Sequence, residues 1–115
     1  MSKFGRTWTN PILRAAGLIL VAACLIQPVR ADRATLRIEM KNVAFLPAKI
    51  TLHAGDSVSW RNEDIFAHTA TSPENGLDVD LKPGTEGVAT FARAGTINYI
   101  CRYHPNMRGQ LVIEP

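Results

Sequence analysis

Apolar and polar residues follow one another in short stretches from residue 36 onward, which is the pattern of β-strands with one buried face. No helical period is sustained beyond a turn. The predicted strands are Leu36–Met40, Ile50–His53, Val58–Arg61, Val88–Phe91, Thr96–Ile100 and Gln110–Ile113. Short strands separated by Gly or Pro at spacings of about 8 to 12 residues predict an all-β, antiparallel sandwich.

Two segments between these strands carry turn residues. Ala54-Gly55-Asp56 predicts a tight turn between two strands. Residues 71–87 are rich in Pro and Gly, and we predict that they are mostly loop, with a brief strand around residues 77–79.

The first 31 residues have the layout of a secretory signal peptide. A basic segment comes first, Ala15–Ile26 forms an apolar run of 12 residues, and Val29 and Ala31 supply small residues for cleavage. The run is too short to span a bilayer, which needs about 20 apolar residues. We therefore predict a signal peptide over residues 1–31, a single domain over residues 32–115, and export to the periplasm.

Cys24 offers an alternative reading of the same segment. Residues 21–24 resemble a bacterial lipobox, which would make Cys24 the lipidated first residue of an anchored protein. The apolar run continues through Leu25 and Ile26, which favours a Cys24 that lies inside the signal peptide and is removed with it.

The charge of the predicted domain differs from that of the whole chain. The chain has 13 basic and 10 acidic residues. Four of the basic residues precede residue 32, so the domain itself is near neutral. It has no basic stripe to meet phosphates, and nucleic acid is therefore not an expected partner.

Cys101, His104 and Met107 place a thiolate, an imidazole and a thioether at three-residue steps. Thiolate and thioether groups select copper(I), and two imidazoles with one thiolate and a weak axial Met make a blue-copper electron-transfer site. One imidazole is missing from this loop, and the remaining histidines of the chain are His53 and His68.

Strand alternation separates these two histidines. If Ile50 and Leu52 face the core, His53 points into solvent beside a turn. His68 begins a Thr-rich segment that can run alongside the strand ending at Cys101. The predicted metal ligands are His68, Cys101, His104 and Met107.

Two other readings of these residues remain open. Cys101 and Met107 can be core residues beside a surface His104, which is the commoner role of each taken singly. A structural zinc site on two His and one Cys is also possible chemically, but it leaves Met107 without a role. An unpaired Cys101 in an oxidising compartment favours a metal ligand over a free thiol.

Taken together, these motifs resemble the cupredoxins, in particular the short-loop amicyanin type, with plastocyanin and pseudoazurin as relatives. The resemblance covers nearly all of residues 36–114 and rests on Phe45-Leu46-Pro47, Ala54–Trp60, His68, Lys82-Pro83-Gly84, Gly95–Cys101 and His104-Pro105-x-Met107-Arg108-Gly109. It implies a Greek-key β-sandwich with one type 1 copper ion. His68, Cys101 and His104 would lie near the trigonal plane and Met107 in the axial position.

The resemblance also makes expectations for the surroundings of the copper ligands. It implies that the Thr69 N–H donates to the Cys101 sulfur, which tunes the potential. Cupredoxins often have Asn at this position, and a Thr hydroxyl is expected to be a weaker bridge between the two ligand loops. Three loop residues differ from the amicyanin pattern, namely Arg102, Tyr103 and Asn106. These differences bear on the identity of the partner and not on that of the metal.

The implied function is transfer of single electrons between redox proteins, without an enzymatic reaction. Expected partners are a donor (a dehydrogenase or cytochrome) and an acceptor (a c-type cytochrome or oxidase), met transiently by a monomer with no membrane span. His104 would be the electron port, ringed by Phe66, Ala67, Tyr103 and Pro105. The alternative is a copper-handling chaperone or resistance protein. A fragment of a multicopper oxidase or nitrite reductase is disfavoured by the small size of the chain.

Overall fold

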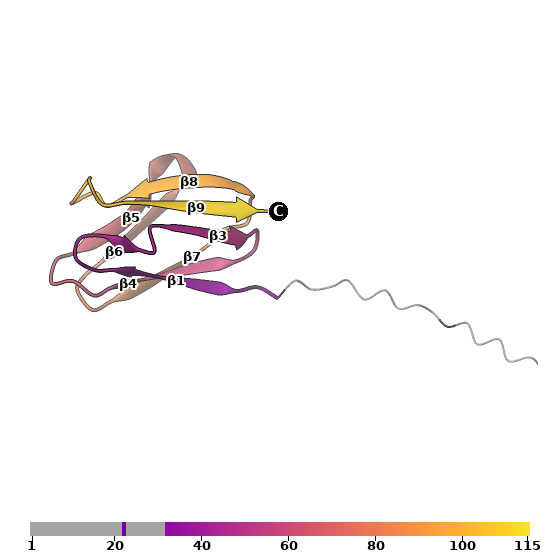
Figure 1. The fold of residues 1–115 in the computed structure, drawn as a ribbon, viewed down its shortest axis with the longest axis horizontal. Coiled ribbons are helices and arrows are strands. Elements are labelled where there is room, and N and C mark those ends of the chain that lie inside the picture. Colours follow the sequence, from indigo (N-terminus) through magenta and orange to yellow (C-terminus); the bar gives the residue numbers. More distant parts are fainter. Residues whose placement is uncertain (1–21, 23–31) are drawn as a thin grey trace, which may run out of the picture. The chain divides into compact units, whose positions relative to one another are not determined.

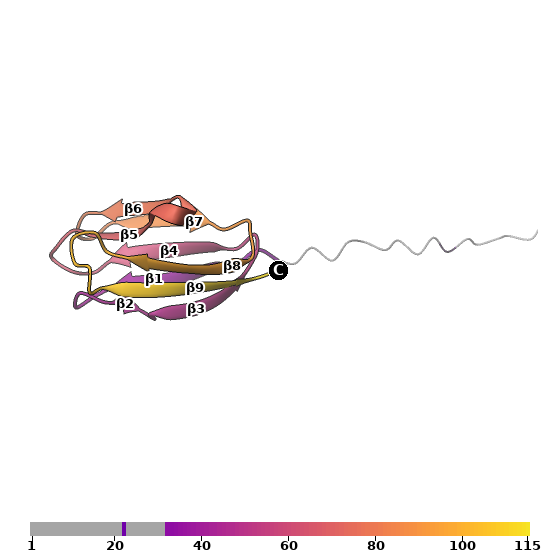
Figure 2. The same cartoon turned by 90° about the horizontal axis from the view of Figure 1, so that it is seen from above.

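The computed structural model describes residue 22 and residues 32–115. Apart from residue 22, the predicted signal peptide lies outside the described residues, and so does Cys24. Nine strands are arranged in two layers (Figures 1 and 2). The one helix of the described part is the 3-10 turn η1, Pro73–Asn75, and no helix there is long and apolar enough to cross a membrane.

Each layer is a mixed β-sheet, so the predicted β-sandwich is confirmed. The first sheet has the order β2-β1-β4-β7, formed by Phe45–Leu46, Thr35–Met40, Ser57–Asn62 and Glu86–Thr90. The second sheet has the order β3-β9-β8-β5-β6, formed by Lys49–His53, Arg108–Glu114, Gly95–Ile100, His68–Ser72 and Leu77–Leu81.

The pairing of two strand pairs differs from the antiparallel expectation. β1 pairs with β4 in parallel, and β3 pairs with β9 in parallel. Parallel neighbours cannot be joined by a tight hairpin and need a crossover. The chain supplies it by passing from β1 and β2 in the first sheet to β3 in the second, and then back to β4.

The segment predicted as mostly loop holds more strand than expected. β5 extends to Ser72, β6 is a five-residue strand, Leu77–Leu81, and β7 starts at Glu86. β6 pairs along its whole length with β5. The two aspartates of β6 point outward between buried or half-buried apolar residues. Because Asp is depleted in strands, this alternation was not recognised as a full strand from the sequence.

Strand alternation in β8 and β9 carries two predicted ligands into the interior. In β8 Ile97 and Tyr99 are buried while their neighbours are exposed, and the next inward position is Cys101. In β9 Leu111 is buried, and the same alternation traced back along the chain reaches Met107, which is buried too. The period of two therefore sets Cys101 and Met107 on the core side at one end of the sheet.

Candidate metal centre

Three of the predicted ligands come together at the end of β8. The Cys101 Sγ lies 3.8 Å from the Nδ1 of His68 and 3.8 Å from the Nδ1 of His104. The three donor atoms all lie within 4.8 Å of one another. Bonds from a metal to protein nitrogen and sulfur are about 2.0 to 2.3 Å long, so this spacing suits one ion bound to all three. The cluster is a possible copper site.

Strand pairing and a tight loop hold the three donors. His68 is the first residue of β5, which pairs with β8 through Thr71 and Ile100 and so lies beside the start of the ligand loop. Within the loop the Met107 N–H donates to the His104 carbonyl at 2.8 Å, and the Cys101 N–H donates to the Met107 carbonyl at 3.0 Å. These two bonds close the loop and leave Met107 buried at its end.

The Thr69 backbone N–H donates to the Cys101 sulfur at 3.3 Å, as predicted. The Thr69 hydroxyl accepts the Arg102 N–H at 2.8 Å and is hydrogen-bonded to the Thr71 hydroxyl. Thr71 in turn donates to Asp78 at 2.8 Å. The Thr side chain therefore bridges the two ligand loops directly and continues the bridge to β6.

On its other side, the ring of His68 meets a carboxylate. The His68 Nε2 and the Asp64 Oδ2 are 2.7 Å apart. An ionised carboxylate only accepts hydrogen bonds, so Nε2 carries a proton in this pair, and the neutral imidazole in that tautomer directs its Nδ1 lone pair toward Cys101. Burial alone would raise the pKa of the Asp64 carboxyl. However, this carboxylate accepts hydrogen bonds from the N–H groups of Val43, His68 and Asn42, and these bonds lower its pKa below the ordinary value.

His104 is the one donor that is not fully buried. His68 and Cys101 have no exposed surface, whereas His104 is partly exposed. The Phe66 ring lies 6.0 Å from the His104 ring, and Phe66 and Tyr103 are each about half exposed. The partly exposed His104 therefore has the half-exposed aromatic ring of Phe66 beside it.

Two loop residues that depart from the amicyanin pattern bind β6. The Arg102 Nε lies 3.2 Å from the Asp78 carboxylate, and the Tyr103 hydroxyl donates to Asp80 at 2.9 Å. Each hydrogen bond raises the pKa of its donor, Arg102 through Asp78 and Tyr103 through Asp80. Arg102 and Tyr103 thus fasten the ligand loop to the edge strand of the second sheet.

His53 lies away from the cluster, as predicted. Its side chain is 65% exposed, and its ring nitrogens face Glu114 at 3.6 Å and Asp56 at 4.0 Å. The sequence reasoning missed Asp64, whose position in a polar turn four residues before His68 was its only signal.

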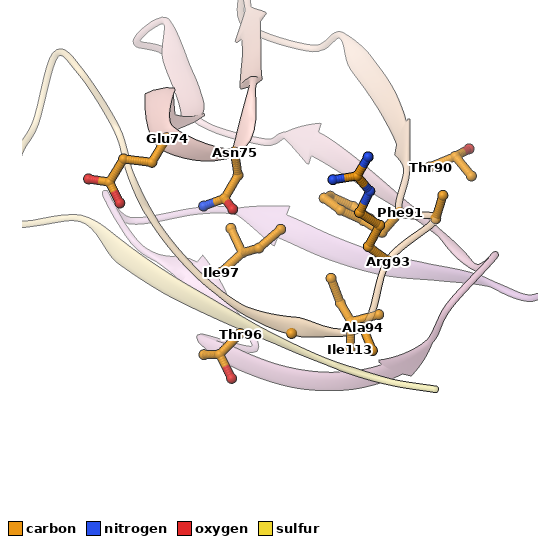
Figure 3. Close-up of a pocket in the computed structure, with 11 residues that line it drawn as sticks. Glu74, Asn75, Thr90, Phe91, Arg93, Ala94, Thr96, Ile97 and Ile113 are labelled. Atoms are coloured by element: carbon orange, nitrogen blue, oxygen red, sulfur yellow. The ribbon is translucent and has the colours of Figure 1, made fainter.

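A separate pocket lies at the opposite end of β8. It has a volume of about 450 Å³ and is lined by η1, by the end of β7 and the segment that follows it, by the first three residues of β8, and by Ile113 of β9. Figure 3 shows the apolar side chains of Phe91, Ile97 and Ile113 together with the polar groups of Asn75 and Arg93. None of its lining residues belongs to the metal cluster.

A β-sandwich with a His–Cys–His cluster at one end defines a small metal-binding β protein. Comparison with known families gives the particular group. Residues 14–113 match the Cupredoxin-like domain, and the chain belongs to this family.

Individual relatives agree with this membership. Chloroplastic plastocyanin from Tetradesmus obliquus is 28% identical over 117 residues, which cover 90% of this chain and 81% of that protein. Amicyanin from Paracoccus versutus is 32% identical over 92 residues, covering 75% of this chain and 68% of that protein. The crystal structure of amicyanin from the same organism has a TM-score of 0.62 at 26% identity, covering 76% of this chain and 86% of that one.

An enzyme also contains this fold. The Cu-containing nitrite reductase from Thermus scotoductus has a TM-score of 0.63 at 26% identity, and the match covers 70% of this chain. It covers 22% of the nitrite reductase chain, so the likeness concerns one part of that enzyme.

Proposed function

We propose that this protein is an electron carrier with one type 1 copper ion held by His68, Cys101, His104 and Met107. The observation that carries the proposal is the arrangement of two imidazole Nδ1 atoms, each 3.8 Å from one buried thiol sulfur. One thiolate with two imidazoles and a nearby Met is the donor set of a blue-copper electron-transfer site.

Copper, when bound, would supply the chemistry by cycling between its two oxidation states with one electron. The chain supplies fixed positions for the donors. His68 begins β5, Cys101 directly follows β8, and Met107 lies in a closed loop. All three side chains are buried, so water is excluded from their side of the site. His104 brings one ring edge to the surface. The carrier transforms no substrate.

The surface around His104 supports transient redox partners. Ile65 is 83% exposed, and its neighbour Phe66 is half exposed with its ring 6.0 Å from that of His104. A small exposed apolar patch suits transient encounters, which bury less than about 1,200 Å². We propose a dehydrogenase or cytochrome as donor, a c-type cytochrome or oxidase as acceptor, and a monomer as the working form.

We also propose that residues 1–31 are a signal peptide and that the domain of residues 32–115 acts in the periplasm. The basic segment, the short apolar run and the small residues at the cleavage positions support this. Lipid anchoring at Cys24 is the alternative, and the mass of the exported protein distinguishes the two, since cleavage after Ala31 removes Cys24.

The rival function is copper handling, in which the protein passes on the ion and not the electron. A thiolate enclosed by two imidazoles is built for retention, which favours the electron carrier. The visible spectrum of the copper-loaded protein separates the two. An intense blue charge-transfer band is expected for the carrier, whereas a colourless protein that holds only copper(I) would contradict it and favour the rival.

Cys101→Ser tests the origin of this band. The blue colour arises from thiolate donation, so the variant should lose it while the metal-free fold, followed by circular dichroism, survives. The matched control is His53→Ala, which should keep the wild-type spectrum because His53 lies on the surface away from the donors. A blue band that persists in Cys101→Ser would remove Cys101 from the site.

Met107→Leu tests the axial ligand. The variant should keep its copper and its blue band, and its reduction potential should rise. Removing a weak axial donor from an already dry site favours copper(I) over copper(II). Cyclic voltammetry measures the change, and a lowered potential would show that Met107 is not an axial ligand.

A further inference from the structure

The carboxylate of Asp64 joins the turn between β1 and β2 to the first residue of β5. Its Oδ1 accepts the Asn42 N–H at 2.7 Å, and its Oδ2 accepts the Val43 N–H at 2.9 Å. The same Oδ2 lies 2.7 Å from the Nε2 of His68. The Asp64 side chain is only 13% exposed; its bond to the buried His68 lies inside the loop, and its two bonds to the turn lie at the surface.

The turn that meets this carboxylate is strained. Lys41 and Ala44 exchange backbone hydrogen bonds of 2.9 and 3.1 Å around Asn42 and Val43, which have φ of +54° and +55°. Two-residue hairpin turns of this kind favour Asn-Gly. A β-branched residue with positive φ is a genuine outlier, and the surrounding structure must stabilise it. The two hydrogen bonds to Asp64 provide that stabilisation.

We propose that Asp64 is a positioning residue of the metal centre, which orients His68 and at the same time locks the strained β1–β2 turn against it. The proposal rests on the function given above, in which His68 is a ligand. Val43 and His68 are far apart in the sequence, and the side chain of Asp64 contacts both. The conformation of an exposed turn is thereby coupled to a buried ligand.

The effect on the metal follows from the chemistry of the pair. A carboxylate that accepts the outer N–H of a ligating imidazole fixes its tautomer and orientation and makes the inner nitrogen more basic. A more basic ligand favours the ion of higher charge. Asp64 therefore strengthens metal binding and lowers the reduction potential, and its loss should weaken binding and raise the potential.

A purely structural role for Asp64 makes a different prediction. The β4–β5 loop is already braced by Asn62, whose amide donates to the carbonyls of Phe66 at 2.7 Å and Leu81 at 3.0 Å. If Asp64 were one more brace, its replacement would change stability and leave His68 and the metal as they are.

Asp64→Asn is the direct test, because its amide group replaces one acceptor oxygen with a donor. The neighbouring Glu63→Gln is the charge-matched control, since Glu63 binds Arg61 at 2.8 Å and no contact joins it to His68. We expect Asp64→Asn to bind Cu²⁺ about 10- to 100-fold more weakly in a titration against a competing chelator. Its potential should rise, and Glu63→Gln should match the wild type in both measurements.

A second measurement uses the metal-free protein. Nitrogen-15 shifts of the His68 ring should report the Nε2-protonated tautomer in the wild type and in Glu63→Gln, and a tautomer mixture in Asp64→Asn. The wild-type tautomer together with unchanged copper affinity in Asp64→Asn would overturn the proposal. If the wild type bound no copper, the proposed function would fail, and the tautomer alone would decide the role of Asp64.

Asp64→Asn can fail to fold because the turn loses its support. Val43→Gly removes that difficulty, since glycine adopts positive φ without steric cost. The pair Val43→Gly and Val43→Gly/Asp64→Asn then isolates the effect on His68. A tautomer and an affinity that are equal in these two proteins would overturn the proposal just as clearly.

Discussion

Gly109 is a residue whose missing side chain makes room for the aromatic core. It pairs with Tyr99 across β8 and β9, and a Cβ at this position would overlap the Tyr99 ring. The Tyr99 ring cannot retreat easily, because it packs edge-on against Phe45 at 4.6 Å and Trp60 at 5.7 Å between centroids.

Gly109→Ala should therefore lower the free energy of unfolding by about 1 to 3 kcal/mol, the usual cost of overpacking a core. Urea denaturation followed by Trp fluorescence measures it. In a Tyr99→Leu background the clash is absent, and the added cost of Gly109→Ala should shrink. An equal cost in both backgrounds would place its origin elsewhere.

At the scale of single residues, the sequence indicated which side chains have metal-binding chemistry better than it indicated which groups a side chain contacts. Cys101, His104 and Met107 could be proposed as ligands because their spacing within one loop is itself the signal, and His68 because alternation turned His53 outward; the structure brings His68, Cys101 and His104 together. Asp64 and Gly109 could not be found in this way. Their roles depend on groups far along the chain, and no local pattern shows which backbone N–H or ring they will meet.

At the level of elements, Asp56 joins the start of β1 to the turn between β3 and β4. Its two carboxylate oxygens accept the Ala34 N–H and the His53 N–H, each at 2.9 Å. These bonds lower the pKa of Asp56 below its ordinary value of 3.8, the bond from Ala34 having the larger effect.

The lowered pKa makes stability depend on pH in a defined direction. The ionised carboxylate stabilises the fold above pH 3.8, and this contribution is lost as the pH falls from 3.8 through the lower folded-state pKa. Asp56→Asn should be less stable than the wild type at pH 7, and the two should converge in acid. Urea midpoints between pH 2.5 and 7 test this, and parallel curves for the two proteins would contradict it.

Most strands could be predicted from the sequence, and the exceptions have identifiable causes. β6 was expected only as a brief strand because Asp78 and Asp80 interrupt its apolar residues, and the structure uses both to hold Arg102 and Tyr103. The parallel pairing of β1 with β4 and of β3 with β9 was missed as well. Alternation reports which face of a strand is buried, and it carries no information on which strand lies alongside.

For the whole molecule, the proposed copper site acts as a cross-link. His68 and Cys101 are 33 positions apart, and within the described residues Cys101 forms no disulfide. Domains of this size bury a modest fraction of their surface. An ion that binds the folded chain and not the unfolded one therefore adds a noticeable share of the stability.

Removal of copper should accordingly lower the melting temperature. With free ion at 100 times the dissociation constant, binding adds about 2.7 kcal/mol to the free energy of unfolding. Differential scanning calorimetry with and without copper measures the shift. Cys101→Ser should lose the shift and His53→Ala should keep it, whereas a shift retained in Cys101→Ser would mean that the ion stabilises the chain from another site.

The donor side chains differ in solvent exposure, and this difference protects the thiol of the metal-free protein. Cys101 has no exposed surface, whereas His104, whose Nδ1 lies 3.8 Å from the Cys101 sulfur, is partly exposed. A disulfide requires two sulfurs at about 2.05 Å, which two copies of this domain cannot reach while their ligand loops stay closed. The imidazole at the rim thus shields the thiol from bulky oxidants and from a second copy, and a small ion arriving from solvent meets nitrogen before it meets sulfur.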